Sequence, residues 1–169
     1  MVDELKCTGR VWNFEDNIDT DQILPGYVMV YPREALKDHA MAGSKVADFA
    51  KQVKAGDIII AGANFGCGSS REQAPLALKD AGVGLIIATS FARIFRRNAI
   101  NIGLPVLQAD LAGKVKDGES VTADIRSAQI QLPTGETLTG TVPGENVIAI
   151  LAAGGLIAKV RRQLATKEI

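Results

Sequence analysis

Excess charge of either sign is missing from this 169-residue sequence, in which nineteen Lys and Arg side chains balance nineteen Asp and Glu. A balanced chain has no net field to draw it onto nucleic acid or an anionic membrane, which argues against both kinds of partner. No stretch reaches the roughly 18 uninterrupted apolar residues of a membrane span. Residues 1–10, which include the acidic Asp3 and Glu4, also lack the apolar core of a signal peptide, so we expect a cytoplasmic protein.

Side chains that bind metals or form disulfides are equally scarce. The two cysteines, Cys7 and Cys67, are far apart and have no partner pattern, so neither a disulfide framework nor a zinc site is expected. The single histidine, His39, lies in a polar helical pattern, where a side chain is usually solvated. We therefore expect no metal or cofactor in this chain.

The residues that are present predict an α/β protein. With 47% apolar residues the chain can bury one core, so we expect a single domain over residues 1–169. The sequence pattern predicts a first strand over 6–14, a long irregular segment over 17–32 and a helix over 33–43 that Gly43 closes.

Two short runs rich in β-branched residues, 57–62 and 84–90, are typical of strands buried on both faces. The segment 69–82 between them has a helical pattern, so the three form one β-α-β unit. A second helix is predicted over 91–103, leading into a strand over 104–108.

The last third of the chain changes character. Apolar and polar residues alternate over 119–125, 128–132 and 136–142, with turn signals between them, which predicts a β-meander. Segment 145–169 is helical in pattern but is interrupted at Gly154 and Gly155. One broken helix or two short ones are expected there.

The stretch "GANFGCGSSREQAP", residues 62–75, joins the first buried strand to the helix that follows it. Ser69 and Glu72 match the S-x-x-E capping box, which predicts Ser69 as the N-cap. Arg71 adds a permanent charge at a helix end whose dipole and free N–H groups attract carboxylate or phosphate. A strand-to-helix turn without function explains these local features equally well, since capping boxes are common.

Three well-known motifs of nucleotide-binding and hydrolase sites are absent from this stretch. It has no lysine for a Walker P-loop, and it lacks both the third glycine of the dinucleotide fingerprint and the G-x-S-x-G elbow of hydrolases. Cys67 as a nucleophile would have Arg71 and the helix end nearby, but no evident base.

Three motifs occur in order over roughly residues 10–107, namely "NIDTDQILPG", "NFGCGSSRE" and "SFARIFRRNAINIGLPVL". With them the chain resembles the small subunit of the isopropylmalate isomerase family, which is similar to the swivelling domain of aconitase. The resemblance implies a swivelling β/β/α fold with a mixed sheet and flanking helices. It also implies a partner, a large subunit that carries a [4Fe–4S] cluster on three cysteines, in a heterodimer or heterotetramer.

The family reaction is a dehydration followed by a rehydration that moves a hydroxyl between adjacent carbons of a malate-type acid. By position, the resemblance makes Ser69 the base, and it makes Ser70 and Arg71 ligands of a substrate carboxylate. The cluster iron of the partner would act as a Lewis acid on the departing hydroxyl. Free N–H groups, a helix N-terminus and a guanidinium could together stabilise a serine alkoxide.

Two further segments carry weaker expectations. Residues 19–22 brace the loop or touch the active site, or they only make Asx-type turns. The arginines of the third motif, Arg93, Arg96 and Arg97, reach the anionic site or the partner, or they form a solvated face. Cys67 stands where aconitases carry a glutamate, which leaves the serines and the arginine intact.

Substrate choice in the family depends on the loop after "DTDQI". Homoaconitase-type relatives have an arginine there for an extra carboxylate, whereas this chain has Val28, Met29 and Val30. An apolar wall favours an isopropyl group and hence leucine biosynthesis, unless these residues only pack on the core. Homoaconitase, a dimethylmalate or methylmalate-type hydratase and a non-catalytic anion-binding module remain alternatives.

Overall fold

The computed structural model describes residues 5–167. Residues 1–4 of the predicted acidic start and residues 168–169 of the last predicted helix lie outside the described residues.

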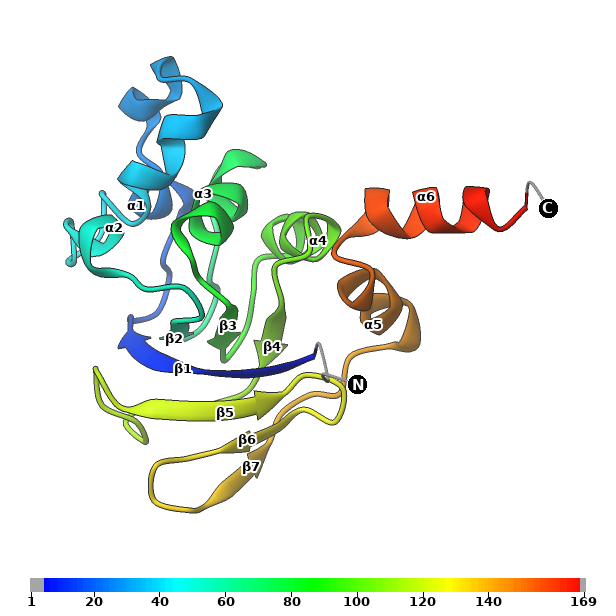
Figure 1. The fold of residues 1–169 in the computed structure, drawn as a ribbon. Helices are drawn as coiled ribbons and strands as arrows, with labels where there is room; N and C mark the ends of the chain where they lie inside the picture. The colour runs from blue at the N-terminus through cyan, green and yellow to red at the C-terminus, as the bar shows by residue number, and fades with distance from the viewer. Residues whose placement is uncertain (1–4, 168–169) are drawn as a thin grey trace.

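Seven strands form one mixed sheet in the order β4-β3-β2-β1-β5-β6-β7 (Figure 1). The strands are β1 (Lys6–Asn13), β2 (Ile58–Ala61), β3 (Leu85–Ala88), β4 (Val106–Gln108), β5 (Ser120–Asp124), β6 (Gln129–Gln131) and β7 (Thr137–Thr139). Strands β1 to β4 pair in parallel, whereas β5, β6 and β7 pair antiparallel. The expected mixed sheet and its β-meander are confirmed.

Helices α1 to α4 lie above the sheet in Figure 1, and α6 extends away from the rest of the chain. The α-helices are α1 (Thr20–Ile23), α2 (Phe49–Gln52), α3 (Gln73–Ala81), α4 (Arg93–Asn101), α5 (Glu145–Ala152) and α6 (Leu156–Ala165), and the 3-10 helices are η1 (Gly26–Val30) and η2 (Arg33–His39). Within residues 5–167, no helix has the length and apolar character needed to cross a membrane.

The β-α-β unit predicted from the two apolar runs is confirmed by β2, α3 and β3. Every residue of β2 and β3 is buried, as expected for strands covered on both faces. Helix α3 packs against η2 and α4. The predicted break in the last helical segment is also confirmed, because Gly154 and Gly155 both have positive φ between α5 and α6.

The segment predicted as a helix over 33–43 is different in the structure. It forms the 3-10 helix η2, and the chain then turns at Met41, which has a φ of 61°. Gly43 does not close the helix. A Cβ on Gly43 would collide with the backbone carbonyl of Asp21, so a close approach of two chain segments requires this glycine.

A buried carboxylate connects β1 to the chain just before β2. Asp57 Oδ2 accepts hydrogen bonds from Arg10 Nη2 at 2.7 Å, Trp12 Nε1 at 2.8 Å and the Lys54 backbone N–H at 2.9 Å. Burial alone would raise the pKa of Asp57, but the three donors outweigh it and hold that pKa below its usual value.

Asp57→Asn should lower the free energy of unfolding by about 1–3 kcal/mol at pH 7, because charge-assisted bonds to buried donors are lost. A depressed pKa stabilises the native state above the ordinary Asp pKa of about 3.9, and the gain disappears as the pH falls through the lower native pKa. Urea unfolding at several pH values measures both effects.

The control is Glu15→Gln, which removes a pair with Lys45 whose side chains are 52% and 53% exposed. We expect it to change stability by less than about 0.5 kcal/mol. An equal fall in the free energy of unfolding for the two variants would contradict a special role for Asp57. So would a difference in that free energy between wild type and Asp57→Asn that stays constant as the pH is lowered.

Candidate active site

The loop 62–72 between β2 and α3 follows an unusual backbone path. Asn64, Gly66 and Gly68 all have positive φ, at 61°, 83° and 98°. A Cβ on Gly66 would also collide with the ring of Phe95 in α4. Glycine is therefore required at Gly66 both by conformation and by space.

Backbone hydrogen bonds hold this loop between two neighbouring segments. On one side Phe65 donates to Ser90 O at 3.0 Å and accepts from Ala92 N at 2.9 Å, in the segment after β3. On the other side Gly66 N donates to Ile18 O at 2.7 Å. The segments that follow three parallel strands thus meet at one edge of the sheet, which is where α/β proteins usually bind ligands.

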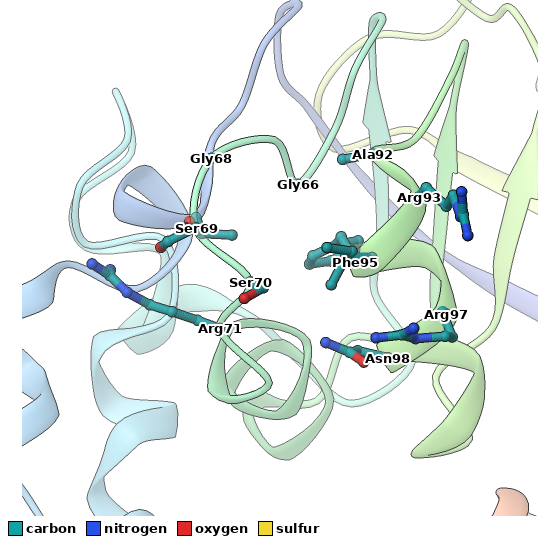
Figure 2. Close-up of a pocket in the computed structure, with 12 residues that line it drawn as sticks. Gly66, Gly68, Ser69, Ser70, Arg71, Ala92, Arg93, Phe95, Arg97 and Asn98 are labelled. Carbon is teal, nitrogen blue, oxygen red and sulfur yellow. Dashed lines mark hydrogen bonds between the residues drawn. The ribbon is translucent and has the colours of Figure 1, made fainter.

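A pocket of about 500 Å³ opens beside the loop, between it and the start of α4 (Figure 2). The lining residues are Thr20, Gly66, Gly68, Ser69, Ser70, Arg71, Ala92, Arg93, Ile94, Phe95, Arg97 and Asn98. The structure therefore brings the three predicted site residues 69–71 together, next to part of the third motif. A volume of this size suits a small molecule.

Ser69 is exposed and its Oγ lies 3.0 Å from Oγ1 of Thr20, at a distance where either hydroxyl can donate. Thr20 is 2% exposed, and its backbone N–H bonds Cys67 O at 2.8 Å. The expected N-cap at Ser69 is wrong. Helix α3 begins at Gln73, with Glu72 at its cap position and no side-chain cap bond. Ser69 lies three residues before this position, and its hydroxyl contacts Thr20.

The capping box of this region lies in the first motif, "NIDTDQILPG". Asp19 accepts from the Gln22 N–H at 2.8 Å, and Gln22 Oε1 accepts from the Asp19 N–H at 2.9 Å, which fixes the four-residue helix α1. Both readings of this segment therefore apply. Asp19 and Gln22 make the turn, while Thr20 lines the pocket.

Arg71 is held at the rim of the pocket. Its Nη1 donates to Asp21 Oδ1 at 2.6 Å and to Leu24 O at 2.9 Å, and the side chain is 24% exposed. Figure 2 shows it extending away from α4, whereas Ser70 lies beside the hollow. Arg71 thus connects the loop 62–72, called the serine loop below, to Leu24, which lies two residues before η1.

The three residues expected to form an apolar wall are not among those that line this pocket. Val28 is fully buried, so a substrate cannot touch it while η1 keeps this conformation, whereas Met29 is 36% and Val30 84% exposed. Within η1 no side chain is charged.

The arginines of the third motif are separated by the structure. Arg93 and Arg97 line the pocket with Ile94 and Asn98, but Arg96 does not. These four side chains form two pairs spaced i, i+4, so they share one face of α4. Ile94 and Asn98 are functional candidates that the motifs alone do not indicate, although the i, i+4 spacing of 94 and 98 is a signal in the sequence.

A sequence profile of the aconitase C-terminal domain matches residues 12–111, which is more than half of the chain. The chain belongs to the aconitase C-terminal domain family. The match includes the loop, α4 and the segment of Thr20, so it covers the whole pocket.

Named relatives in this family agree with the resemblance seen in the motifs. The chain is 54% identical over 151 residues to the methanogen homoaconitase small subunit of Methanothermobacter thermautotrophicus, covering 88% of this chain and 87% of that protein. It is 48% identical over 163 residues to the isopropylmalate/citramalate isomerase small subunit of Methanocaldococcus jannaschii, covering 95% and 96%.

A crystal structure titled 3-isopropylmalate dehydratase, also from Methanocaldococcus jannaschii, superposes with a TM-score of 0.90 at 42% identity and covers 96% of this chain and 98% of that one. Together these similarities identify this aconitase-family chain as a small subunit of a hydro-lyase of the isopropylmalate and homoaconitase type.

Metal-binding residues are not gathered anywhere in residues 5–167, where no group of three or more His, Cys, Asp or Glu could hold an ion. Cys7, on β1, is half-buried, and burial raises the pKa of its thiol. Cys67 is also half-buried and does not line the pocket. Residues 5–167 of this aconitase-family chain therefore do not fit an iron–sulfur cluster.

Gly66→Ala should destabilise the chain by about 1–3 kcal/mol or more, because strain at positive φ adds to the collision with Phe95. Gly113→Ala is the matched control, since Gly113 also has positive φ, at 71°, but has nothing near its missing Cβ. That control should cost about 1 kcal/mol. Chemical denaturation of both variants measures the difference, and equal losses would show that the Phe95 contact does not require glycine.

Proposed function

We propose that this chain is the small subunit of a 3-isopropylmalate dehydratase, which interconverts 2-isopropylmalate and 3-isopropylmalate in leucine biosynthesis. The observation that carries the proposal is the pocket in which Ser69, Ser70 and Arg71 meet beside Thr20. We also propose a large subunit as partner, with a [4Fe–4S] cluster that supplies the Lewis acid for the departing hydroxyl. The small-subunit names of the relatives support that partner.

In this proposal Ser69 is the base. Its Oγ takes the proton from the carbon next to a carboxylate, and the electron pair of that C–H bond forms the C=C bond. The C–O bond breaks, and the hydroxyl leaves with its electron pair and takes a proton from solvent to become water. In rehydration a water gives its proton back to solvent and its hydroxyl bonds the carbon that had lost the proton, while the C=C electron pair takes the proton from Ser69 Oγ at the carbon that had lost the hydroxyl.

A serine can act as a base only if its alkoxide is stabilised. The Thr20 hydroxyl, 3.0 Å from Ser69 Oγ, can donate to that alkoxide. Thr20 itself is buried and held through its backbone, so the donor is already oriented before the reaction.

Arg71 and Ser70 would bind a substrate carboxylate. Both bonds that Arg71 makes come from Nη1, so among the described residues Nη2 and Nε remain available for a further acceptor. A carboxylate can therefore bind without displacing Asp21. Ser70 is exposed and lines the pocket next to Arg71, so its hydroxyl can donate to the same group (Figure 2).

The isopropyl preference rests on the loop that begins next to Arg71. Arg71 bonds the carbonyl of Leu24, two residues before η1, and η1 presents Met29 and Val30 without any charge. We assign the contact with the third substituent to these two exposed residues and not to the buried Val28. A carboxylate placed there would be desolvated without a partner.

Homoaconitase is the second candidate function, favoured by the 54% identity to a small subunit of that name. It would place a third carboxylate where the proposed function places an isopropyl group. Activity of the assembled pair on both substrates distinguishes the two candidates.

Ser69→Ala should reduce kcat of the assembled enzyme by about 100-fold or more, as expected for loss of a catalytic base. Stability should fall by only about 0.5–1.5 kcal/mol, because one hydrogen bond is lost and no helix cap. Turnover is measured with the purified large subunit added, since this chain alone should have none. The neighbouring Ser70→Ala should mainly raise KM. Retention of near-normal kcat by Ser69→Ala would exclude Ser69 as the base.

Met29→Arg should shift the ratio of kcat/KM for isopropylmalate over homoaconitate by about tenfold or more toward homoaconitate, because the new charge offers a carboxylate a partner. The wild-type pair should prefer isopropylmalate. Tyr27→Arg adds the same charge in the same helix and should leave the ratio nearly unchanged. A wild-type preference for homoaconitate would favour the second candidate, and an unchanged ratio in Met29→Arg would remove that residue from the substrate contact.

A further inference from the structure

We infer that Arg97, together with Asn98, forms a second carboxylate-binding wall of the pocket, opposite the serine loop. This inference rests on the proposed function, because it assigns the second carboxylate of a malate-type acid to α4. Arg71 and Ser70 account for one carboxylate, and a dicarboxylate in a pocket of about 500 Å³ has a second one to place.

The direction of the side chains selects Arg97 and Asn98 from the lining residues of α4. Figure 2 shows both extending across the hollow toward Ser70, from the opposite side of the pocket. A guanidinium offers a planar fork of donors that matches a carboxylate, and the Asn98 amide adds a further donor beside it. Neither side chain makes a hydrogen bond or ion pair to any residue within 5–167.

The charge around the pocket is one-sided. Three arginines line it, and no aspartate or glutamate does, although the whole chain carries equal numbers of acidic and basic residues. Arg71 already has Asp21 as a partner, whereas Arg93 and Arg97 are exposed and have none among the described residues. The unneutralised positive charge of the pocket therefore lies on α4.

Helix α4 also carries these charges against local preference. Arg93 is its first residue, at the positive end of the helix dipole, where cations are disfavoured. Arg93 and Arg97 are like charges four residues apart, which destabilises a helix. No side chain caps this end. Departures from local rules are expected where a ligand supplies the missing partner, and here a bound anion would neutralise the pair.

The test compares two ligands that differ by one carboxylate, malate and lactate. Their affinities for the purified chain, alone and paired with the large subunit, are measured by calorimetric titration at constant ionic strength. Wild type should bind malate more tightly than lactate. Arg97→Gln should weaken malate binding by about tenfold or more, while lactate binding changes less than about twofold.

Arg96→Gln is the matched control, because Arg96 is the adjacent residue of the same helix and does not line the pocket. It should leave both affinities unchanged. Arg97→Lys keeps the charge but loses the planar fork, so it should give an intermediate affinity for malate. Size-exclusion chromatography checks that each variant still pairs with the large subunit.

Three results would overturn the inference: malate binding by Arg97→Gln within about twofold of wild type, an equal loss in Arg96→Gln, or no preference of the wild type for malate over lactate. Loss of pairing in Arg97→Gln would assign the residue to the subunit interface and would also overturn it. Binding is measured without turnover, so the two tests are independent. An inactive wild-type pair would count against the proposed function, whereas the affinities of the Arg97 variants would still test the role of Arg97.

Discussion

The backbone bonds that hold loop 62–72 between its two neighbours are the constraint on which the site depends. Gly66 N bonds the segment after β1, and Phe65 bonds the segment after β3. Together with the bond from Thr20 N to Cys67 O, these bonds place Ser69 beside Thr20 and the loop beside α4. Loop 62–72 starts at the end of β2, and the segment that it bonds starts at the end of β3. Every residue of both strands is buried, so the core of the sheet determines where the residues of the pocket lie.

The charge that lines the pocket differs from the average charge of the chain. The chain as a whole is balanced, yet the pocket is lined by arginines without any carboxylate. Asp21 pairs with Arg71 at the rim. The arrangement favours an anionic ligand of small size, because the positive charge of Arg93 and Arg97 on α4 is not neutralised by any residue that lines the pocket.

Most elements of the fold could be predicted because their patterns are local. The two apolar runs predicted buried parallel strands, alternation predicted the meander, and Gly154 and Gly155 predicted the break before α6. The helix over 33–43 was wrong in type, because Gly43 is needed where the backbone passes close to Asp21 and not as a cap. Ser69 was also placed wrongly as an N-cap. A side-chain hydroxyl can bond either a helix N–H or a distant partner, and only the folded chain brings Thr20 within reach.

The sequence by itself determined the family and the order of most elements, because these follow from short motifs and periodic patterns. It also predicted residues 69–71 as site residues, and in the structure all three line one pocket. Only the tertiary structure decided that Thr20 faces Ser69, that Arg71 turns toward Asp21 and Leu24, and that Val28 is buried while Met29 is exposed. It also decided that Arg93 and Arg97, but not Arg96, line the pocket. Side-chain direction and burial depend on what packs against each segment, and those neighbours lie far away in the chain.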